Sequence, residues 1–318
     1  MMGPIHEDGW DLLKNNNFDV FEITDFTEQS LITNLKEVDG IALRTAKLSK
    51  TILQECKKLK IVSRHGVGYD NVDLEYLNLN KQALAITGTA NAISVAEHVM
   101  TMFLYLTKKI NLSNDLVKKN KFTEKRSLPD FFEIYKKNIL IMGFGRIGQA
   151  VAKRCLGFES NVYVYDPFID KKSIEEKNCY KIDFDEGIAK ADFITIHMPL
   201  NQKTKNLISK KEFKSIKNEC IIINTARGGI INENDLIWAL TNKEIFGAGL
   251  DVFEKEPPEE NNPLFKFENV ILTPHNAALT LECRKRMAVE VCQNINFFFN
   301  DISQINMANI VNRKNINL

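Results

Sequence analysis

The sequence predicts an α/β protein with two doubly wound parallel sheets, each covered by helices on both faces. Short, nearly continuous runs of Ile, Val, Leu and Phe alternate along the chain with helical patterns, as strands buried on both faces do. This alternation occurs in two series, which a polar, lysine-rich segment at residues 111–137 separates. The chain has 318 residues, which is enough for two domains with a core each.

The first series occupies the amino-terminal part of the chain. A helix is predicted to begin near Asp8, and two more are predicted at residues 28–36 and 50–57. Strands are predicted at residues 18–22, 39–43, 60–63 and 83–87. A flavodoxin-like domain should begin with a strand, but Pro4 leaves no room for one before the first helix. Either that strand is absent or the true start of the chain lies upstream.

The second series follows the lysine-rich segment. Its strands are predicted at residues 138–142, 161–166, 192–197, 220–224, 246–250 and 269–272. A helix is predicted before the lysine-rich segment, at residues 94–110, because Ser94 and Glu97 have the spacing of a capping box. The lysine-rich segment is too long for a simple loop, and we interpret it as a crossing arm or a dimer contact.

A last helix is predicted at residues 281–300, after the final strand of the second series. We expect it to pack back against the first domain, which makes that domain discontinuous. The predicted domains are therefore a substrate domain of residues 1–93 and 282–318, and a nucleotide-binding domain of residues 94–281.

Composition and charge exclude several classes of function. The formal net charge is +1, so no global field attracts nucleic acid or a membrane surface. The six cysteines form no Cys-x-x-Cys pair, and we expect buried free thiols in a reducing compartment and no metal site. No stretch is apolar enough to span a bilayer and no secretory signal opens the chain, so a cytoplasmic protein is expected.

A glycine-rich turn joins the first strand of the second series to a helix. The strand at residues 138–142 runs directly into Gly143-Phe144-Gly145-Arg146-Ile147-Gly148. Gly143 makes the tight turn, Gly145 lets the backbone approach a pyrophosphate, and Gly148 lets the helix pack closely on the strand. Free N–H groups and the helix dipole favour an anion here. The turn, including Arg146 and Ile147, is predicted to bind a dinucleotide in a Rossmann-type domain.

An acidic residue at the end of the next strand narrows the choice of dinucleotide. Asp166 ends the run Val162-Tyr-Val-Tyr-Asp, about 20 residues beyond the glycines, where a carboxylate bonds the ribose hydroxyls. The same carboxylate would repel the 2′-phosphate of NADP. The sequence therefore predicts NAD as the cofactor.

Three polar residues follow the carboxyl ends of predicted strands, where chemistry takes place in such sheets. Arg227 can clamp a carboxylate and polarise the reacting oxygen. His275 can take a hydroxyl proton, since histidine titrates near neutral pH, and a carboxylate such as Glu256 can orient its imidazole. From the residues alone, Glu254 or Glu259 could be the partner instead, and Arg227 and His275 could have structural roles.

Six segments in order resemble the D-isomer-specific 2-hydroxyacid dehydrogenases, the group that contains phosphoglycerate dehydrogenase. They are Ser63-Arg-His-Gly-Val-Gly-Tyr-Asp-Asn-Val-Asp, Thr87-Gly-Thr-Ala-Asn-Ala-Ile-Ser-Val-Ala-Glu-His, the glycine-rich turn, Asn224-Thr-Ala-Arg-Gly-Gly, residues 251–258, and Thr273-Pro-His-Asn. The resemblance covers nearly the whole chain and implies two similar α/β domains with the active site in the cleft. It also implies a dimer formed through the helix at Ser94, and a short form without the regulatory carboxyl-terminal domain of longer phosphoglycerate dehydrogenases.

The resemblance also implies roles for particular residues. It makes Arg227 the substrate-binding arginine, Glu256 the partner of the catalytic histidine, and His275 the acid and base. The loop Gly66-Val67-Gly68 corresponds to the one that receives the substrate carboxylate. Further residues that the resemblance places at the cofactor are Asp251, at the nicotinamide carboxamide, and Thr89 and Thr225. The family often has Thr-Pro where this chain has Thr89-Ala90, which puts the rigidity of that loop in doubt.

Two arginines bear on the identity of the acid. Arg44 and Arg64 resemble arginines of the phosphoglycerate dehydrogenase branch and could neutralise a substrate phosphate, although both could also form surface ion pairs. We favour 3-phosphoglycerate as the substrate, with hydroxypyruvate or glyoxylate reduction as the alternative. His65, within the substrate loop, is unusual, and it could contact substrate or solvent.

One alternative belongs to a different class of protein. NAD-sensing corepressors such as the C-terminal binding proteins keep the same three polar residues, so the motifs do not exclude that function. Such proteins differ in having a peptide-binding groove and long disordered tails. An initial-rate assay distinguishes this alternative from a metabolic dehydrogenase.

Overall fold

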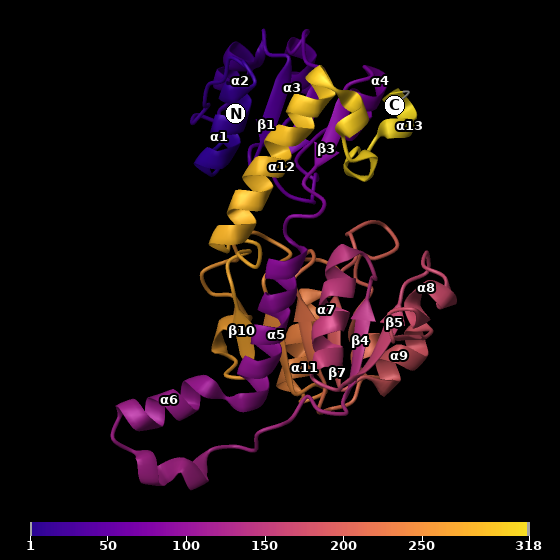
Figure 1. Cartoon of the computed structure of the whole chain (residues 1–318). Helices are drawn as coiled ribbons and strands as arrows, with labels where there is room; N and C mark the ends of the chain where they lie inside the picture. The colour runs from indigo at the N-terminus through magenta and orange to yellow at the C-terminus, as the bar shows by residue number, and fades with distance from the viewer. Residues whose placement is uncertain (1, 317–318) are drawn as a thin grey trace. The chain divides into compact units, whose positions relative to one another are not determined.

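The computed structural model describes residues 2–316, which divide into two compact units (Figure 1). The first unit contains the residues up to Asn91 and those from Leu279 onward, and the second unit is Ala92–Ala278. The boundaries predicted from the sequence, after residues 93 and 281, lie within a few residues of the unit boundaries after Asn91 and Ala278. Each unit has a parallel sheet, which confirms the predicted α/β class.

The sheet of the first unit has three parallel strands within the described residues. Their order is β1 (Gly40–Leu43), β2 (Ile61–Arg64) and β3 (Ala83–Ile86). The unit's helices are α1 (Glu7–Asn15), α2 (Glu28–Leu35), α3 (Lys50–Glu55), α4 (Leu74–Leu79), α12 (Leu281–Asn300) and α13 (Arg313–Ile316), with short 3-10 turns η3 (Ile302–Gln304) and η4 (Met307–Asn309).

Apolar clusters cover both faces of this sheet because its strands are apolar on both sides. On one face, Ile41 and Leu43 pack with residues of α2, α3 and α4. On the other face, Ala42 packs with Leu13 of α1 and Ile295 of α12. Helix α12 contacts α1 and all three strands, so the carboxyl-terminal helix is part of the core of this unit.

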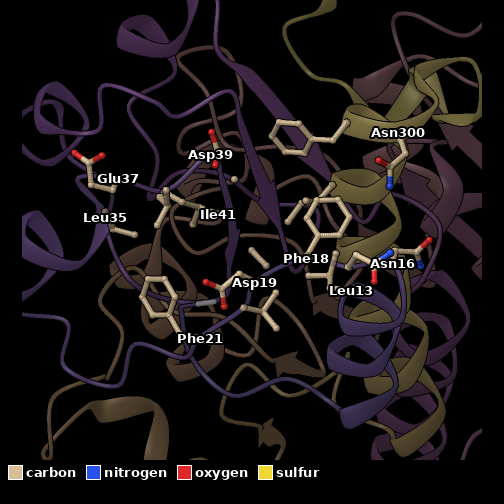
Figure 2. Close-up of a pocket in the computed structure, with 17 residues that line it drawn as sticks. Leu13, Asn16, Phe18, Asp19, Phe21, Leu35, Glu37, Asp39, Ile41 and Asn300 are labelled. Carbon is tan, nitrogen blue, oxygen red and sulfur yellow. The ribbon is translucent and has the colours of Figure 1, made fainter.

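The strand predicted at residues 18–22 is wrong. Within residues 2–316, residues 18–22 form no ladder, and the adjacent Ile23 has an isolated parallel bridge to Met2. A strand needs a neighbour to bond its backbone, and the position between this segment and β1 holds a cavity of about 680 Å³ instead (Figure 2). Its lining includes Phe18, Phe21 and Ile41.

The sheet of the second unit has seven parallel strands within the described residues, in the order β10-β9-β8-β7-β4-β5-β6. The strands are β4 (Asn138–Met142), β5 (Asn161–Tyr165), β6 (Tyr180–Lys181), β7 (Phe193–Ile196), β8 (Ile221–Asn224), β9 (Gly247–Leu250) and β10 (Val270–Leu272). The short edge strand β6 was not predicted, because two exposed residues carry no strand pattern. The chain order reverses beside β4, which places a topological switch point where the glycine-rich turn begins.

Helices cover both faces of this larger sheet. They are α5 (Ala92–Lys108), α7 (Arg146–Gly157), α8 (Lys171–Glu175), α9 (Phe184–Lys190), α10 (Lys210–Phe213) and α11 (Glu233–Thr241), with the 3-10 turn η2 (Pro263–Lys266). Two apolar clusters, one containing Phe103 of α5 and the other Leu236 of α11, pack against the strands. None of the helices within residues 2–316 is both long and apolar enough to cross a bilayer.

The capping box predicted at Ser94 is wrong. Helix α5 begins two residues earlier, at Ala92, and Ser94 lies inside it. The Ser94 hydroxyl is buried and donates to the backbone carbonyl of Ala277 at 2.6 Å. The Ser94 side chain therefore bonds Ala277, far along the chain, whereas the local pattern predicted that it caps the helix.

The lysine-rich segment folds into two short helical pieces, α6 (Ile110–Lys118) and η1 (Phe122–Ser127). Neither has a buried residue, and Figure 1 shows both extending away from the sheet of their own unit. These two pieces therefore form an arm outside the core, whereas Ile134, farther along the segment, is buried in an apolar cluster of the second unit.

All six cysteines are free and buried, as the sequence predicted. Burial raises the pKa of the Cys56 thiol to about 11 and that of Cys292 to about 12. These thiols behave as small apolar core residues.

Candidate active site

The glycine-rich turn links β4 to α7, and each glycine in it has a different surrounding. Gly143 has a φ of 93°, and a Cβ there would lie 2.7 Å from the carbonyl oxygen of His197. A Cβ on Gly148 would lie 2.1 Å from the carbonyl oxygen of Gly143. A Cβ on Gly145 would meet no atom within 4 Å. The fold itself thus requires Gly143 and Gly148, whereas Gly145 faces open space at the start of α7.

Asp166 follows β5 and holds the same turn. One carboxylate oxygen accepts from the backbone N–H of Phe144 at 2.8 Å, and the other accepts from the N–H of Phe168 at 2.8 Å. The carboxylate is partly exposed, and the Phe168 side chain is 90% exposed beside it. Asp166 therefore supports the turn and still presents a partly exposed carboxylate at the end of β5.

The turn and the neighbouring strand ends fit a dinucleotide. Thr225, at the end of β8, is 9% exposed, and its hydroxyl has no hydrogen-bond partner within residues 2–316. Arg146 is exposed and Ile147 is partly exposed at the start of α7. The helix N-terminus at Gly145 and the unsatisfied hydroxyl of Thr225 can each bond a polar group of a ligand.

His275 and Glu256 form a direct contact. His275 Nδ1 lies 2.8 Å from Glu256 Oε2, and Glu256 Oε1 accepts from the N–H of Phe253 at 3.1 Å. The His275 side chain is 51% exposed and that of Glu256 is 39% exposed. The other candidate carboxylates have different partners, since Glu254 accepts from the N–H of Glu233 and Glu259 pairs with Lys255.

Arg227 lies in the loop after β8. Its Nη1 donates to the carbonyl of Ala226 at 2.7 Å, and its own carbonyl accepts from the side chain of Asn224 at 2.8 Å. The next residue, Gly228, allows a close approach to another loop, because a Cβ there would lie 1.8 Å from the carbonyl oxygen of Phe253. The arginine loop thus packs against the segment that carries Glu256.

Asp251 fastens the loop that carries His275. Its carboxylate is 1% exposed and accepts from Thr273 Oγ1 at 2.6 Å, from the N–H of Asn276 at 2.9 Å and from the N–H of Ala277 at 3.0 Å. His98 Nε2 also lies 3.0 Å from Thr273 Oγ1. The family resemblance implies a contact of Asp251 with the cofactor, and this structural role was not predicted because the partners of Asp251 lie more than 20 residues away.

The first unit contains the remaining residues that the sequence singled out. In the Gly66-Val67-Gly68 loop, the N–H of Gly66 donates to Thr87 Oγ1 at 2.7 Å. The N–H groups of Val67 and Gly68 have no hydrogen-bond partner within the described part of the chain. Thr89 Oγ1 donates to Glu290 of α12 at 2.9 Å.

The two arginines near this loop contact backbone carbonyls. Arg44 Nη1 donates to the carbonyl of Pro4 at 3.1 Å. Arg64 Nη1 donates to the carbonyl of His65 at 2.5 Å, and its Nε donates to Asn71 at 3.3 Å. His65 itself is buried, and burial, followed by the charges of Arg44 and Arg64, lowers its pKa to about 4.

His197, which follows β7 beside the glycine-rich turn, was not among the residues that the sequence singled out. Its Nε2 lies 2.8 Å from Thr195 Oγ1, its Nδ1 has no partner within residues 2–316, and burial lowers its pKa to about 3. The signal that could have found it is a histidine at the end of an apolar strand that neighbours β4.

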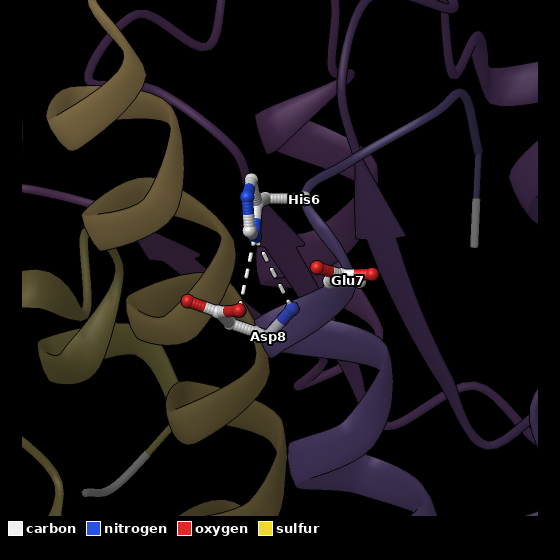
Figure 3. A group of neighbouring side chains, drawn as sticks. All are labelled: His6, Glu7 and Asp8. Atoms are coloured by element: carbon white, nitrogen blue, oxygen red, sulfur yellow. Dashed lines mark hydrogen bonds and ion pairs between the residues drawn. The ribbon is translucent and has the colours of Figure 1, made fainter.

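Three neighbouring side chains at the start of α1 have the arrangement of possible metal ligands. They are His6, Glu7 and Asp8 (Figure 3). His6 Nδ1 accepts from the N–H of Asp8 at 3.3 Å, so it caps the helix. The cap explains the cluster without an ion.

Comparison with known proteins identifies the family. Residues 100–277 match the family model described as the NAD-binding domain of D-isomer specific 2-hydroxyacid dehydrogenases, and this span is more than half of the 318 residues. The chain belongs to this family. The match confirms the resemblance inferred from the motifs and the predicted NAD-binding domain.

Relatives with different substrates in their names match the chain at similar identity. The D-3-phosphoglycerate dehydrogenase of Archaeoglobus fulgidus is 36% identical over 293 residues, which cover 92% of this chain and 55% of that protein. The hydroxypyruvate reductase of Thermotoga maritima is 34% identical over 297 residues, which cover 92% of this chain and 95% of that protein. The chain spans about half the length of the phosphoglycerate dehydrogenases it matches.

A solved structure confirms the fold of this family member. The D-lactate dehydrogenase of Aquifex aeolicus, in complex with NAD and lactic acid, has a TM-score of 0.88 and is 27% identical. The match covers 98% of each chain. The fold class predicted from the sequence is therefore confirmed.

Proposed function

We propose that this protein is an NAD-dependent dehydrogenase that interconverts a D-2-hydroxy acid and the corresponding 2-oxo acid. The observation that carries the proposal is the 2.8 Å contact between His275 Nδ1 and Glu256 Oε2, in a unit that belongs to the NAD-binding domain of this family. A half-exposed imidazole paired with a carboxylate is able to exchange protons with a ligand.

His275 is the proton acceptor in this proposal. Glu256 faces Nδ1, so the carboxylate favours the tautomer with hydrogen on Nδ1 and leaves Nε2 as the basic nitrogen. Nε2 takes the hydroxyl proton during oxidation and returns it during reduction. Bound NAD would accept and supply the hydride.

Arg227 is the residue that we assign to the substrate carboxylate and the reacting oxygen. Its guanidinium can bind two oxygens at once, and its positive charge stabilises negative charge that develops on the oxygen during reduction. The close packing of its loop at Gly228 against Phe253 holds it beside the segment of Glu256.

The cofactor contacts are assigned to the strand ends and turn of the second unit. The pyrophosphate would bind at the turn of residues 143–148, the ribose at Asp166, and a further polar group at the unpartnered hydroxyl of Thr225. Asp251 and Thr89, whose side chains have internal partners, are proposed as cofactor neighbours through the resemblance alone.

For the first unit, we propose that the loop at residues 66–68 binds the substrate carboxylate. The N–H groups of Val67 and Gly68 have no internal partner and can donate to an anion, while that of Gly66 is already engaged by Thr87. Changing Val67 to Pro removes one donor, so KM for the acid should rise while the affinity for NAD stays constant. An unchanged KM would contradict this assignment.

The favoured substrate is 3-phosphoglycerate, because Arg44 and Arg64 add positive charge in the unit that carries this loop. Hydroxypyruvate is the second candidate, and the observation in its favour is that the Thermotoga maritima relative matches over 95% of its length. The test is a panel of initial rates with NADH and phosphohydroxypyruvate, hydroxypyruvate, glyoxylate or pyruvate. A highest kcat/KM with phosphohydroxypyruvate supports the first choice, and no turnover of any of them contradicts the enzyme proposal and favours an NAD-sensing protein.

We also propose that the protein is a homodimer. The arm formed by α6 and η1 exposes 57% of Ile110, 58% of Val117 and 65% of Phe122. Exposed apolar side chains on an arm without buried residues are suited to cover a second copy of the chain. The dimer proposal predicts that the native protein sediments at twice the chain mass. It also predicts that Phe122→Asp sediments at a lower mass than the control Glu124→Gln.

A further inference from the structure

Helix α12 packs against the sheet of its own unit (Figure 1) and carries a row of polar side chains. Arg286, Glu290 and Asn294 are spaced four residues apart, so they lie one above another on one side of the helix. Each of them bonds residues at, or just beyond, the carboxyl ends of β2 and β3. Arg286 Nε, for example, donates to the carbonyl of Ala90 at 3.0 Å. The row therefore contacts the edge of the sheet at which these two strands end.

Asn294 is the most deeply buried member of the row, with 3% of its surface exposed. Its Nδ2 donates to Ser63 Oγ of β2 at 3.3 Å and to the carbonyl of Ile86, the last residue of β3, at 3.1 Å. An amide nitrogen carries two hydrogens, so one side chain can bond both strands at once. Asn294 therefore ties together the carboxyl ends of two neighbouring strands.

Glu290, one turn earlier on α12, bonds the segment that leaves β3. Its Oε2 accepts from Thr89 Oγ1 at 2.9 Å, and its Oε1 accepts from Asn309 Nδ2 at 2.8 Å. Asn309 Nδ2 also lies 3.5 Å from the side-chain oxygen of Asn294. The carboxylate and the amide thus belong to one connected network, in which Asn294 has a fixed orientation.

The two strand ends that Asn294 joins lead directly into the loop at residues 66–68. The N–H of Gly66 donates to Thr87 Oγ1 at 2.7 Å, and the N–H of Thr87 donates to the carbonyl of Gly66 at 3.1 Å. These two bonds couple the loop after β2 to the residue that follows β3. The direction of the loop's remaining N–H groups therefore depends on how far apart the ends of β2 and β3 are held.

We propose that Asn294 is a positioning residue for the loop at residues 66–68. It fixes the ends of β2 and β3 and, through Thr87, aims the N–H groups of the loop at the carboxylate of the acid. Asn294 acts through these strands and not by contact with the acid. The inference rests on the proposed function of this loop. Donors that are held in place before binding raise the affinity, because folding has already ordered them.

The kinetic test uses Asn294→Ala, which removes both bonds. KM for the best acid of the panel should rise about 10-fold while kcat and the affinity for NAD change by less than about 3-fold. A residue that only stabilises the fold would behave differently, because its loss lowers the active fraction and the apparent kcat but leaves KM unchanged. The control is Asn296→Ala, which removes an amide from the same helix that bonds only Asn300, and its KM should be native.

A second measurement needs no substrate. Hydrogen exchange of the Gly66 and Thr87 amides should be at least about 10-fold faster in Asn294→Ala than in the native chain, because both amides are bonded within the coupled segment. The Ala83 amide, which bonds the carbonyl of Lys60 at the other end of β3, should exchange at the native rate. Equal exchange of Gly66 and Thr87 in the two proteins would overturn the proposal.

Ser63→Ala covers the case in which Asn294→Ala does not fold. It removes one acceptor of Asn294 and leaves only a hydroxyl-sized gap, so exchange of the Gly66 amide should accelerate by a smaller factor. Native exchange in this variant would overturn the proposal.

Val67→Pro separates this proposal from the proposed function of the loop. If Val67→Pro raises KM and Asn294→Ala does not, the loop binds the acid but Asn294 does not position it, and the proposal is overturned. If neither variant changes KM, the assignment of the loop to the carboxylate fails. The exchange measurement then decides by itself whether Asn294 holds the loop.

Discussion

The Asp251 carboxylate lies 2.6 Å from Thr273 Oγ1 and binds two further N–H groups of the loop around His275. His275 has a φ of 51°, a left-handed conformation that is unfavourable for a residue with a side chain. Such a conformation costs about 1–3 kcal/mol and persists only when the surroundings enforce it. The three bonds to Asp251 supply that enforcement next to the paired imidazole.

Asp251→Asn should weaken this loop. An amide has one acceptor oxygen, and its NH₂ group would face a backbone N–H, so one or more of the three bonds is lost. The free energy of unfolding should fall by about 2–3 kcal/mol, the scale for bonds to a buried charged group, and kcat should fall with it. Urea unfolding and initial rates measure both quantities. Thr273→Ser keeps the hydroxyl and is the control. If Asp251→Asn kept the stability and the kcat of the native protein, the loop would not depend on this carboxylate.

Two glycine substitutions should separate folding from cofactor binding. Gly145→Ala places its Cβ in open space, so Tm should stay close to that of the native protein while the affinity for NAD falls at least about 10-fold. Gly148→Ala places its Cβ 2.1 Å from the carbonyl oxygen of Gly143, so it should lower Tm. Thermal unfolding and NAD titration test both variants. Full NAD affinity in Gly145→Ala would place the pyrophosphate elsewhere.

Asp166→Ala should narrow the preference for NAD over NADP. The carboxylate would repel the 2′-phosphate of NADP, and its removal abolishes this repulsion. Because Asp166 also bonds the N–H groups of Phe144 and Phe168, the affinity for both cofactors should decrease. Competitive kinetics with the two cofactors measure the ratio. If the ratio is the same as in the native protein, Asp166 does not discriminate between them.

Acid should destabilise the protein through its buried histidines. Burial lowers the pKa of His65 to about 4 from 6.5, so between these values the unfolded chain binds a proton that the folded chain does not. The stabilisation that comes from keeping His65 neutral is therefore complete above pH 6.5. As the pH falls toward 4, the free energy of unfolding decreases, by about 2 kcal/mol between pH 8 and pH 5. His197, whose pKa is lowered to about 3, adds to the effect.

The histidine prediction is tested by urea unfolding at pH 8, 6.5 and 5. His65→Gln cannot titrate, so its free energy of unfolding should fall by about 2 kcal/mol less than that of the native protein over this range. Equal pH dependence in the two proteins would mean that His65 is not held neutral by its surroundings.

Much of the second unit could be predicted from sequence because its signals are local. The apolar strand at residues 138–142 and the glycines that follow it specify a tight turn, and the structure shows why Gly143 and Gly148 allow no side chain. The helix at residues 281–300 was predicted with the bounds of α12, and in the structure the Thr280 hydroxyl accepts from the N–H of Cys283 at its amino end.

The parts that sequence reasoning missed depend on partners far along the chain. Ser94 has the spacing of a helix cap, but Ala277 is its actual partner. The strand at residues 18–22 has a suitable pattern, but it lacks a neighbour to pair with. The bonds of Asp251 to the loop of His275 likewise arise only when β9 and β10 are placed side by side.

The most direct test of the proposed chemistry is turnover by His275→Ala with the best acid of the panel. Loss of the proton-transferring group should lower kcat by about 10²–10⁴, while the affinity for NAD stays unchanged. His6→Ala, which removes a histidine that caps α1, is the control and should turn over normally. Native-like turnover by His275→Ala would contradict the assignment of His275 as the catalytic acid and base.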